Sequence, residues 1–323
     1  MKNLKFLILF MVLAFSLPCI YGGCGGGGGG SESSGGISYS GLAAPAEISE
    51  LNAEDIAGGA FGAGLIGDGM MGLGLDRSLN DNYVGEFRTV KIPLILRDSL
   101  DLIDFAAPSM RGVPAALQTE TDTINGDCGG SMTYTVSADV DEGTFSGSFT
   151  FSSYCNGGTI ISGSASFDGR MNMDTSEFVE AHLSFNNLSG GDLVLSGDID
   201  MDFSVTPNVT TFDAYGQDPG SGKVFWIRDY TIVIDEGSDY IQITMDGRFY
   251  HPDYGYVTLS TTDPFVLYSG DEWPTSGSLV VTGAGDSRGR ITAIDNTYCK
   301  VEADVDGDNA YEWETGSVAW DDI

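Results

Sequence analysis

The chain is poor in the residues that most often build catalytic sites. It has 323 residues but only two histidines, and no His-Glu-x-x-His motif occurs. His182 alternates with apolar neighbours, which directs its side chain outward from a strand, and His251 precedes Pro252 in an expected turn. Neither histidine is close in sequence to a recognisable nucleophile motif. Catalysis by carboxylates alone would not need histidine. We nevertheless predict that the protein is not an enzyme and that it has no cofactor.

Cysteine is scarce as well. None of the five cysteines forms a Cys-x-x-Cys pair, so the spacing of a zinc or redox site is missing. Cys299 is in phase with Val301, Ala303 and Val305, and we therefore expect a buried thiol that packs as a small apolar side chain.

Basic residues are few in number. Fourteen Lys and Arg stand against 47 Asp and Glu, which gives a formal net charge of −33. Like charges repel, so this composition argues against nucleic acid as a partner and against anionic membrane surfaces. Most acidic residues stand singly between apolar ones, as on the solvated face of a sheet.

The N-terminal apolar run is too short to cross a membrane. It extends over residues 6–17, about twelve residues, after a basic start at Lys2 and Lys5. Gly22-Gly23-Cys24 follows, and this arrangement resembles the lipobox of bacterial lipoproteins. Tyr21 departs from the aliphatic residue usual in that family, and Cys19 fits less well because Pro18 precedes it.

The resemblance implies how this N-terminus is processed. Residues 1–23 would be a signal peptide, and Cys24 would carry diacylglycerol and an amide-linked acyl chain such as palmitate. The residue after Cys24 is Gly25 and not the Asp associated with retention in the inner membrane. The family analogy therefore implies an outer-membrane lipoprotein, on the periplasmic or the surface side, whose membrane partner is reached through this lipid anchor.

A tether and a small helical segment follow. Residues 24–48 are the expected lipidated tether, rich in Gly and Ser, with an r.m.s. span of roughly 27 Å for a flexible coil. We assign 49–117 to a helical segment packed on the β domain. Asn52 can cap a short first helix that soon meets Gly58-Gly59. A second helix is predicted over 93–105, where Leu96, Leu100 and Ile103 share one face.

From residue 118 to 323, apolar residues recur at every second position, and this alternation predicts strands. Polar turns separate these runs without intervening helices, so we predict a mainly β, antiparallel, up-and-down sheet that curls into a barrel-like or two-sheet domain. A transmembrane barrel is excluded because the second face carries Asp, Ser and Thr. The side chains predicted to point inward are Phe145, Phe149, Phe151, Leu195, Ile199, Met201 and Phe203, and those predicted to be solvated are Thr150, Ser196, Asp198 and Asp200.

The register of the first hairpin predicts a disulfide. If residues 140–143 form a four-residue loop, Ala138 lies opposite Phe145. Each step back along the first strand then matches one step forward along the second. The same register opposes Cys128 to Cys155 on the inward face, where a bridge is sterically reasonable if the two residues form a non-hydrogen-bonded pair.

Two acidic patterns carry a weak metal or catalytic interpretation. Asp304, Asp306 and Asp308 invite a calcium site, but the positions that an EF-hand reserves for Gly and Glu hold Asn309 and Thr315. We favour a turn formed by 307–309, with Ala303 opposite Trp313. For the row Asp198, Asp200 and Asp202 we favour a solvated sheet face over a carboxylate site.

The β-rich part resembles certain uncharacterised bacterial envelope lipoproteins. The resemblance is carried by Cys128-Gly129-Gly130, Asp306-Gly307-Asp308 and Trp320, and it implies no activity. Three functions are therefore considered. The first is a non-enzymatic structural or surface-interaction role, the second is a carrier of lipid or another apolar ligand, and the third is a carboxylate-dependent glycan hydrolase.

Overall fold

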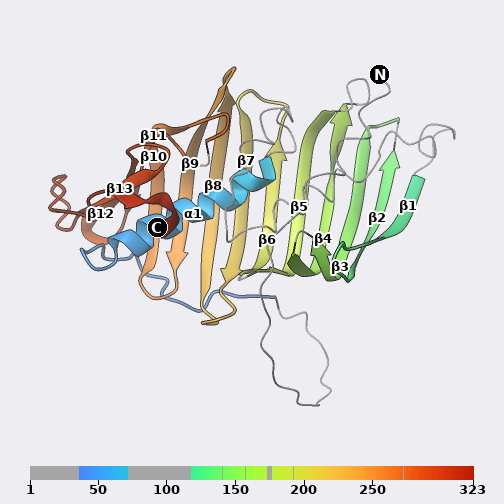
Figure 1. The fold of residues 1–323 in the computed structure, drawn as a ribbon, viewed down its shortest axis with the longest axis horizontal. Coiled ribbons are helices and arrows are strands. Elements are labelled where there is room, and N and C mark those ends of the chain that lie inside the picture. Colours follow the sequence, from blue (N-terminus) through green and yellow to red (C-terminus); the bar gives the residue numbers. More distant parts are fainter. Residues whose placement is uncertain are drawn as a thin grey trace, which may run out of the picture.

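One antiparallel sheet, preceded by one α-helix, forms the part of the chain that the computed structural model describes (Figure 1). That part comprises residues 36–71, 118–139, 141–156, 158–172, 177–191, 193–271 and 273–323. Each strand pairs with the next strand of the chain from β1 to β14, and β15 pairs with β13. The predicted mainly β, up-and-down architecture is confirmed. The strands form a single open sheet, neither closed into a barrel nor divided into two sheets.

The elements occur along the chain in the following order. They are α1 (Ala53–Met71), β1 (Gln118–Asn125), β2 (Ser131–Asp139), β3 (Thr144–Asn156), β4 (Thr159–Asn172), β5 (Glu177–Gly190), β6 (Leu193–Asp202), β7 (Asn208–Gln217), β8 (Val224–Glu236), β9 (Tyr240–His251), β10 (Gly255–Tyr268), β11 (Ser276–Thr282), β12 (Arg288–Ala293), β13 (Tyr298–Asp304), β14 (Trp313–Glu314) and β15 (Val318–Ala319), with 3-10 turns at Ala284–Asp286 and Trp320–Asp322.

Alternation along each strand separates an apolar face from a polar one. The apolar face carries α1 and is called the inner face; the polar one is called the outer face. The predicted inward set is buried, including Phe149 and Ile199 at 0–1% exposure, except that Phe203 is only partly buried. Thr150, Asp198 and Asp200 are exposed on the outer face, as predicted.

Ser196 differs from its prediction as a solvated residue. It is only 8% exposed, because its hydroxyl accepts a hydrogen bond from the Asn187 N–H at 2.8 Å. Asn187 has a φ of 49° and lies where the β5–β6 register shifts, so a bulge of the neighbouring strand covers Ser196.

The helix α1 is longer than the short helix that the sequence predicts. It begins at Ala53, directly after Asn52, but continues through Gly58-Gly59 to Met71. A Cβ atom at Gly59 would lie 3.0 Å from the Phe249 ring, and one at Gly64 would overlap the Met245 side chain. These glycines are therefore the positions at which the helix approaches the sheet closely, and the packing energy outweighs their low helix propensity.

Both the sheet and the C-terminus hold α1. The Tyr230 hydroxyl, which is fully buried, donates a 2.8 Å hydrogen bond to the Ala60 carbonyl, and burial raises the pKa of Tyr230 well above its usual value. Phe61 stacks on Trp320 with a centroid distance of 5.0 Å. The first helix is thus packed between the inner face of β7–β13 and the last residues of the chain.

The predicted Cys128–Cys155 disulfide is present, with a Cα–Cα distance of 5.2 Å. The predicted register is also observed, since Ala138 pairs with Phe145. The β2–β3 ladder nevertheless stops at Ser131, and Cys128 is exposed in the bend that connects β1 to β2. Only Cys155 is buried, so the prediction that both cysteines face inward is wrong for Cys128.

Part of the expected tether is bound to the sheet. We call Tyr39–Ile48 the N-terminal strap. The Tyr39 hydroxyl donates to the His251 carbonyl at 3.0 Å, and Ala46 donates its N–H to the Tyr256 carbonyl at 2.8 Å. Ile48 donates its N–H to the Ser287 hydroxyl at 3.1 Å. The strap therefore belongs to the folded unit.

Several predictions concern residues outside the described part. They are the signal peptide and lipidation at Cys24, and the helix predicted over 93–105 with Leu96, Leu100 and Ile103. Of the helices in the described ranges, none is long and apolar enough to cross a membrane.

Loss of the disulfide should destabilise the fold. The bridge joins residues 27 positions apart, so the chain-entropy relation gives about 3–4 kcal/mol of the free energy of unfolding. We expect the double variant Cys128→Ala/Cys155→Ala to lose about that much in urea-induced unfolding without reductant. Adding reductant should then destabilise the wild type but not the variant; an equal response of both proteins would contradict this account.

His251 should make stability depend on pH. Burial lowers its pKa below 6.5, although the Asp253 and Asp55 carboxylates oppose the shift. The folded state therefore binds fewer protons, so His251's contribution is present above pH about 6.5 and is lost as pH falls through the folded-state pKa. Unfolding free energies measured between pH about 7 and about 5 should decline for the wild type and decline less for His251→Asn. Parallel curves for the two proteins would refute the assignment.

Candidate functional site

Antiparallel pairing places polar side chains of the outer face in rows that cross the strands. Asp168 of β4 pairs with His182 of β5, and His182 pairs with Asp200 of β6. On β7, Thr211 pairs with Asp200 and extends the row. Each of these residues occupies an outward position because its chain neighbours face inward. The pairing therefore places the His182 imidazole between the carboxylates of Asp168 and Asp200. His182 points outward, as predicted.

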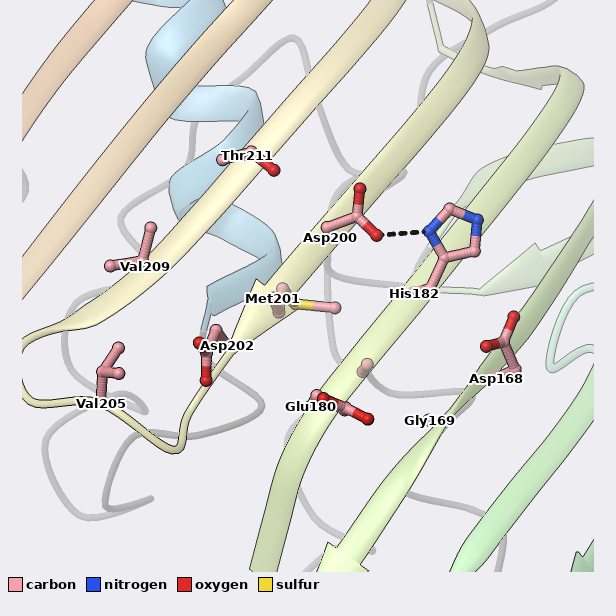
Figure 2. A pocket seen from close by; sticks show the side chains of 11 residues that line it. Asp168, Gly169, Glu180, His182, Asp200, Met201, Asp202, Val205, Val209 and Thr211 are labelled. Carbon is pink, nitrogen blue, oxygen red and sulfur yellow. Dashed lines mark hydrogen bonds and ion pairs between the residues drawn. The ribbon is translucent and has the colours of Figure 1, made fainter.

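This row lies in an open groove of about 770 Å³. Figure 2 looks onto the outer face, with α1 behind the strands. The groove is lined by Asp168, Gly169, Glu180, Ala181, His182, Asp200, Met201, Asp202, Val205, Val209 and Thr211. Four of these side chains are carboxylates and one is a histidine, and valines lie at the end of the groove near the β6–β7 turn.

His182 makes solvent-exposed contacts with neighbouring carboxylates. Its Nδ1 lies 2.7 Å from the Asp200 Oδ1, and its Nε2 lies 3.9 Å from the Asp198 Oδ1. The three side chains are 37%, 66% and 57% exposed, for His182, Asp200 and Asp198 respectively. Water screens pairs of this exposure, so the row contributes little to stability and its carboxylates stay accessible to a partner.

Two further carboxylates of the groove are held ionised. The Arg170 guanidinium donates to both oxygens of Glu180, at 2.6 and 3.3 Å, and this hydrogen bonding lowers the pKa of Glu180. Hydrogen bonds from the hydroxyl and backbone N–H of Ser204 lower the pKa of Asp202. The groove therefore presents negative charge at neutral pH.

This electrostatic pattern suits binding better than acid catalysis. A glycan hydrolase needs one carboxyl group with a raised pKa to protonate the leaving group. Where a carboxyl pKa is shifted in the described residues, it is shifted downward, at Glu180, Asp202, Asp218, Asp253 and Glu302.

The weak calcium candidate is a loop held by its own carboxylates. Oxygens of Asp304, Asp306, Asp308 and Glu312 lie within 4.8 Å of one another. Asp304 is buried, and it accepts the N–H groups of Gly307 and Asn309 at 2.8 and 3.0 Å.

The turn predicted in place of a calcium site is supported in part. Asn309 has a φ of 73°, the left-handed conformation expected of it, and Ala303 pairs with Trp313 as predicted. The loop from Asp304 to Trp313 is longer than the predicted three-residue loop.

A Gly-x-Ser-x-Gly match at 285–289 escaped the sequence analysis. In a nucleophile elbow, the serine lies between a strand and a helix with its oxygen exposed. Here Ser287 lies between the antiparallel strands β11 and β12, is 2% exposed, and donates to the Ala284 carbonyl while accepting the Ile48 N–H. The residue is therefore a structural link to the strap.

The sequence analysis also missed a row of aromatic rings on the outer face. Tyr215, Trp226, Tyr250 and Tyr256 occupy successive paired positions on β7–β10. Successive ring centroids are 5.5, 4.6 and 5.1 Å apart, and Tyr39 of the strap packs on Tyr250 at 5.6 Å. The sequence does place each of these rings at an outward-facing position of its own strand. Recognising that the rings form a row requires the register of three hairpins.

Cys299 is a buried free thiol, as predicted, and burial raises its pKa to about 12. Such a thiol is unreactive at neutral pH. Comparison of the chain with protein-family models, with curated proteins and with solved structures gives no match.

Proposed function

We propose that this protein is a lipid-anchored lipoprotein of the outer membrane with a non-enzymatic, surface-interaction role. The observation that carries the interaction role is the exposed row of Asp168, His182 and Asp200 within the outer-face groove. The lipobox-like sequence ending in Cys24 supports the anchor.

The groove favours a partner with basic side chains. It contains four carboxylates, and Arg170 neutralises one of them through its pair with Glu180. Uncompensated negative charge attracts cations over several ångströms and speeds their association. The valines at the β6–β7 end offer apolar contact for the stem of a Lys or Arg side chain.

The other two functions receive less support from the described residues. A carrier of apolar ligands needs free apolar lining, whereas the inner-face side chains of β2–β10 are buried in one continuous core. The downward pKa shifts of carboxyl groups disfavour a glycan hydrolase, which needs a protonated acid.

The anchor is tested by replacing Cys24 with Ala. Wild-type protein should sediment with membranes and begin at Cys24 with added acyl mass, whereas Cys24→Ala should be released. Cys19→Ala, a matched change in the same short segment, should leave both properties unaltered. An unmodified Cys24 in membrane-bound wild type would refute the anchor.

The interaction role is tested with the soluble Cys24→Ala protein and a lysine- and arginine-rich peptide in isothermal titration calorimetry. Asp168→Asn/Asp200→Asn should weaken binding roughly tenfold, since each exposed charge pair contributes up to about 1 kcal/mol. Added salt should reduce this difference.

The matched control is Asp321→Asn/Asp322→Asn, which removes the same charge from exposed positions of the C-terminal 3-10 turn. It should bind as the wild type does. Equal weakening by both pairs would show that net charge, and not the groove, attracts the peptide.

A further inference from the structure

The N-terminal strap determines which edge of the sheet lies nearest the anchor. The strap passes the ends of the strands where β9 turns into β10 and β11 turns into β12. There the Tyr256 N–H donates to the Ala44 carbonyl at 2.9 Å, and the Ala284 N–H donates to the Ala46 carbonyl at 2.6 Å. Figure 1 shows this blue segment along the lower ends of the strands. We call these ends the strap edge and the other ends the far edge.

The strap edge exposes two leucines. Leu42 is 55% exposed and Leu51, in the turn before α1, is 93% exposed. Exposed apolar side chains alone do not select this edge, because the far edge exposes Val205, Tyr268, Ile294 and Tyr298. The position of the strap does distinguish the two edges, because the chain that leads from Cys24 reaches the strap edge first.

Few residues separate Cys24 from the described part of the chain, compared with the length of the strands. Residues 25–35 are mostly Gly and Ser, and a flexible coil of that length and composition has an r.m.s. span of roughly 18 Å. The 12 residues of β9 span about 40 Å from edge to edge. A chain anchored at Cys24 therefore keeps the strap edge near the lipid and the far edge away from it.

We infer that the strap edge faces the bilayer and that Leu42 and Leu51 contact it; this rests on the lipid anchor proposed above. Exposed acidic side chains, Glu47 and Glu50, flank the leucines, while Lys223 of the same edge is paired with Asp253 at 2.5 Å. The edge therefore fits a zwitterionic lipid surface, and anionic headgroups repel it. In this orientation the acidic groove, which extends toward the far edge at Val205, remains open to a partner.

The orientation is tested by energy transfer from a dye on the protein to an acceptor-labelled lipid. Lipidated protein is reconstituted in phosphatidylcholine vesicles and labelled at Glu50→Cys on the strap edge or Ser238→Cys on the far edge. Both positions are exposed, and the native cysteines are bridged, buried or lipidated. Transfer from position 50 should exceed that from position 238 several-fold. Equal or reversed efficiencies would overturn the orientation.

The leucine contact is tested with an environment-sensitive dye at position 50. Its emission should shift to the blue on phosphatidylcholine vesicles, and Leu42→Ser/Leu51→Ser should abolish the shift. Val205→Ser/Ile294→Ser, which removes two exposed apolar side chains from the far edge, should retain it. Addition of phosphatidylglycerol should reduce the shift. A shift that the strap-edge variant retains would refute the contact.

A second attachment separates this inference from the proposed anchor. Cys24→Ala protein with a hexahistidine segment placed before Gly25 is held on nickel-chelating lipid, and the two transfer measurements are repeated. A missing acyl mass on Cys24 in the native protein would refute the anchor alone. Equal transfer from both positions on nickel lipid would refute the orientation alone.

Discussion

The uninterrupted antiparallel ladder is the constraint on which the rest of the structure depends. Because each strand from β1 to β14 pairs with the next strand of the chain, the side-chain alternation of one strand determines the faces of its neighbours along the sheet. The inner face is thereby apolar along the whole ladder, and α1 covers its β7–β13 part through glycines that admit Phe249 and Met245. The outer face receives the carboxylates, the hydroxyl groups and the aromatic row. Position on the ladder thus determines both the core and the candidate site.

Local patterns predicted the features that depend on neighbours in the chain. The period of two gives the strands, and the four-residue loop at 140–143 gives the register that brings Cys128 to Cys155. The length of α1 was not predictable in this way. Gly58-Gly59 reads locally as the end of a helix, and the reason that the helix continues is a ring on β9, nearly two hundred residues away. The Asn187 bulge that buries Ser196 depends on pairing between two strands.

The candidate site was predictable residue by residue but not as an arrangement. The outward directions of His182, Asp198 and Asp200 follow from their own strands. Their meeting with Asp168 requires the pairing of β4, β5 and β6, where bulges interrupt the count that a sequence alone can follow. The strap is the extreme case, since Tyr39 has no periodic neighbours and its partners lie on β8 and β9. The site therefore depends on long-range register more than the fold does.

The packing of Phe61 against Trp320 has a consequence for the order of synthesis. Phe61 belongs to α1, which precedes every strand of the sheet, and Trp320 directly follows the last strand, β15. Hairpins of an up-and-down sheet form from adjacent segments and can assemble as the chain emerges. The helix must complete its packing later, because its aromatic partner is translated only after all the strands of the sheet. A chain that stops before Trp320 therefore keeps the strands of its ladder but loses the contact that encloses α1.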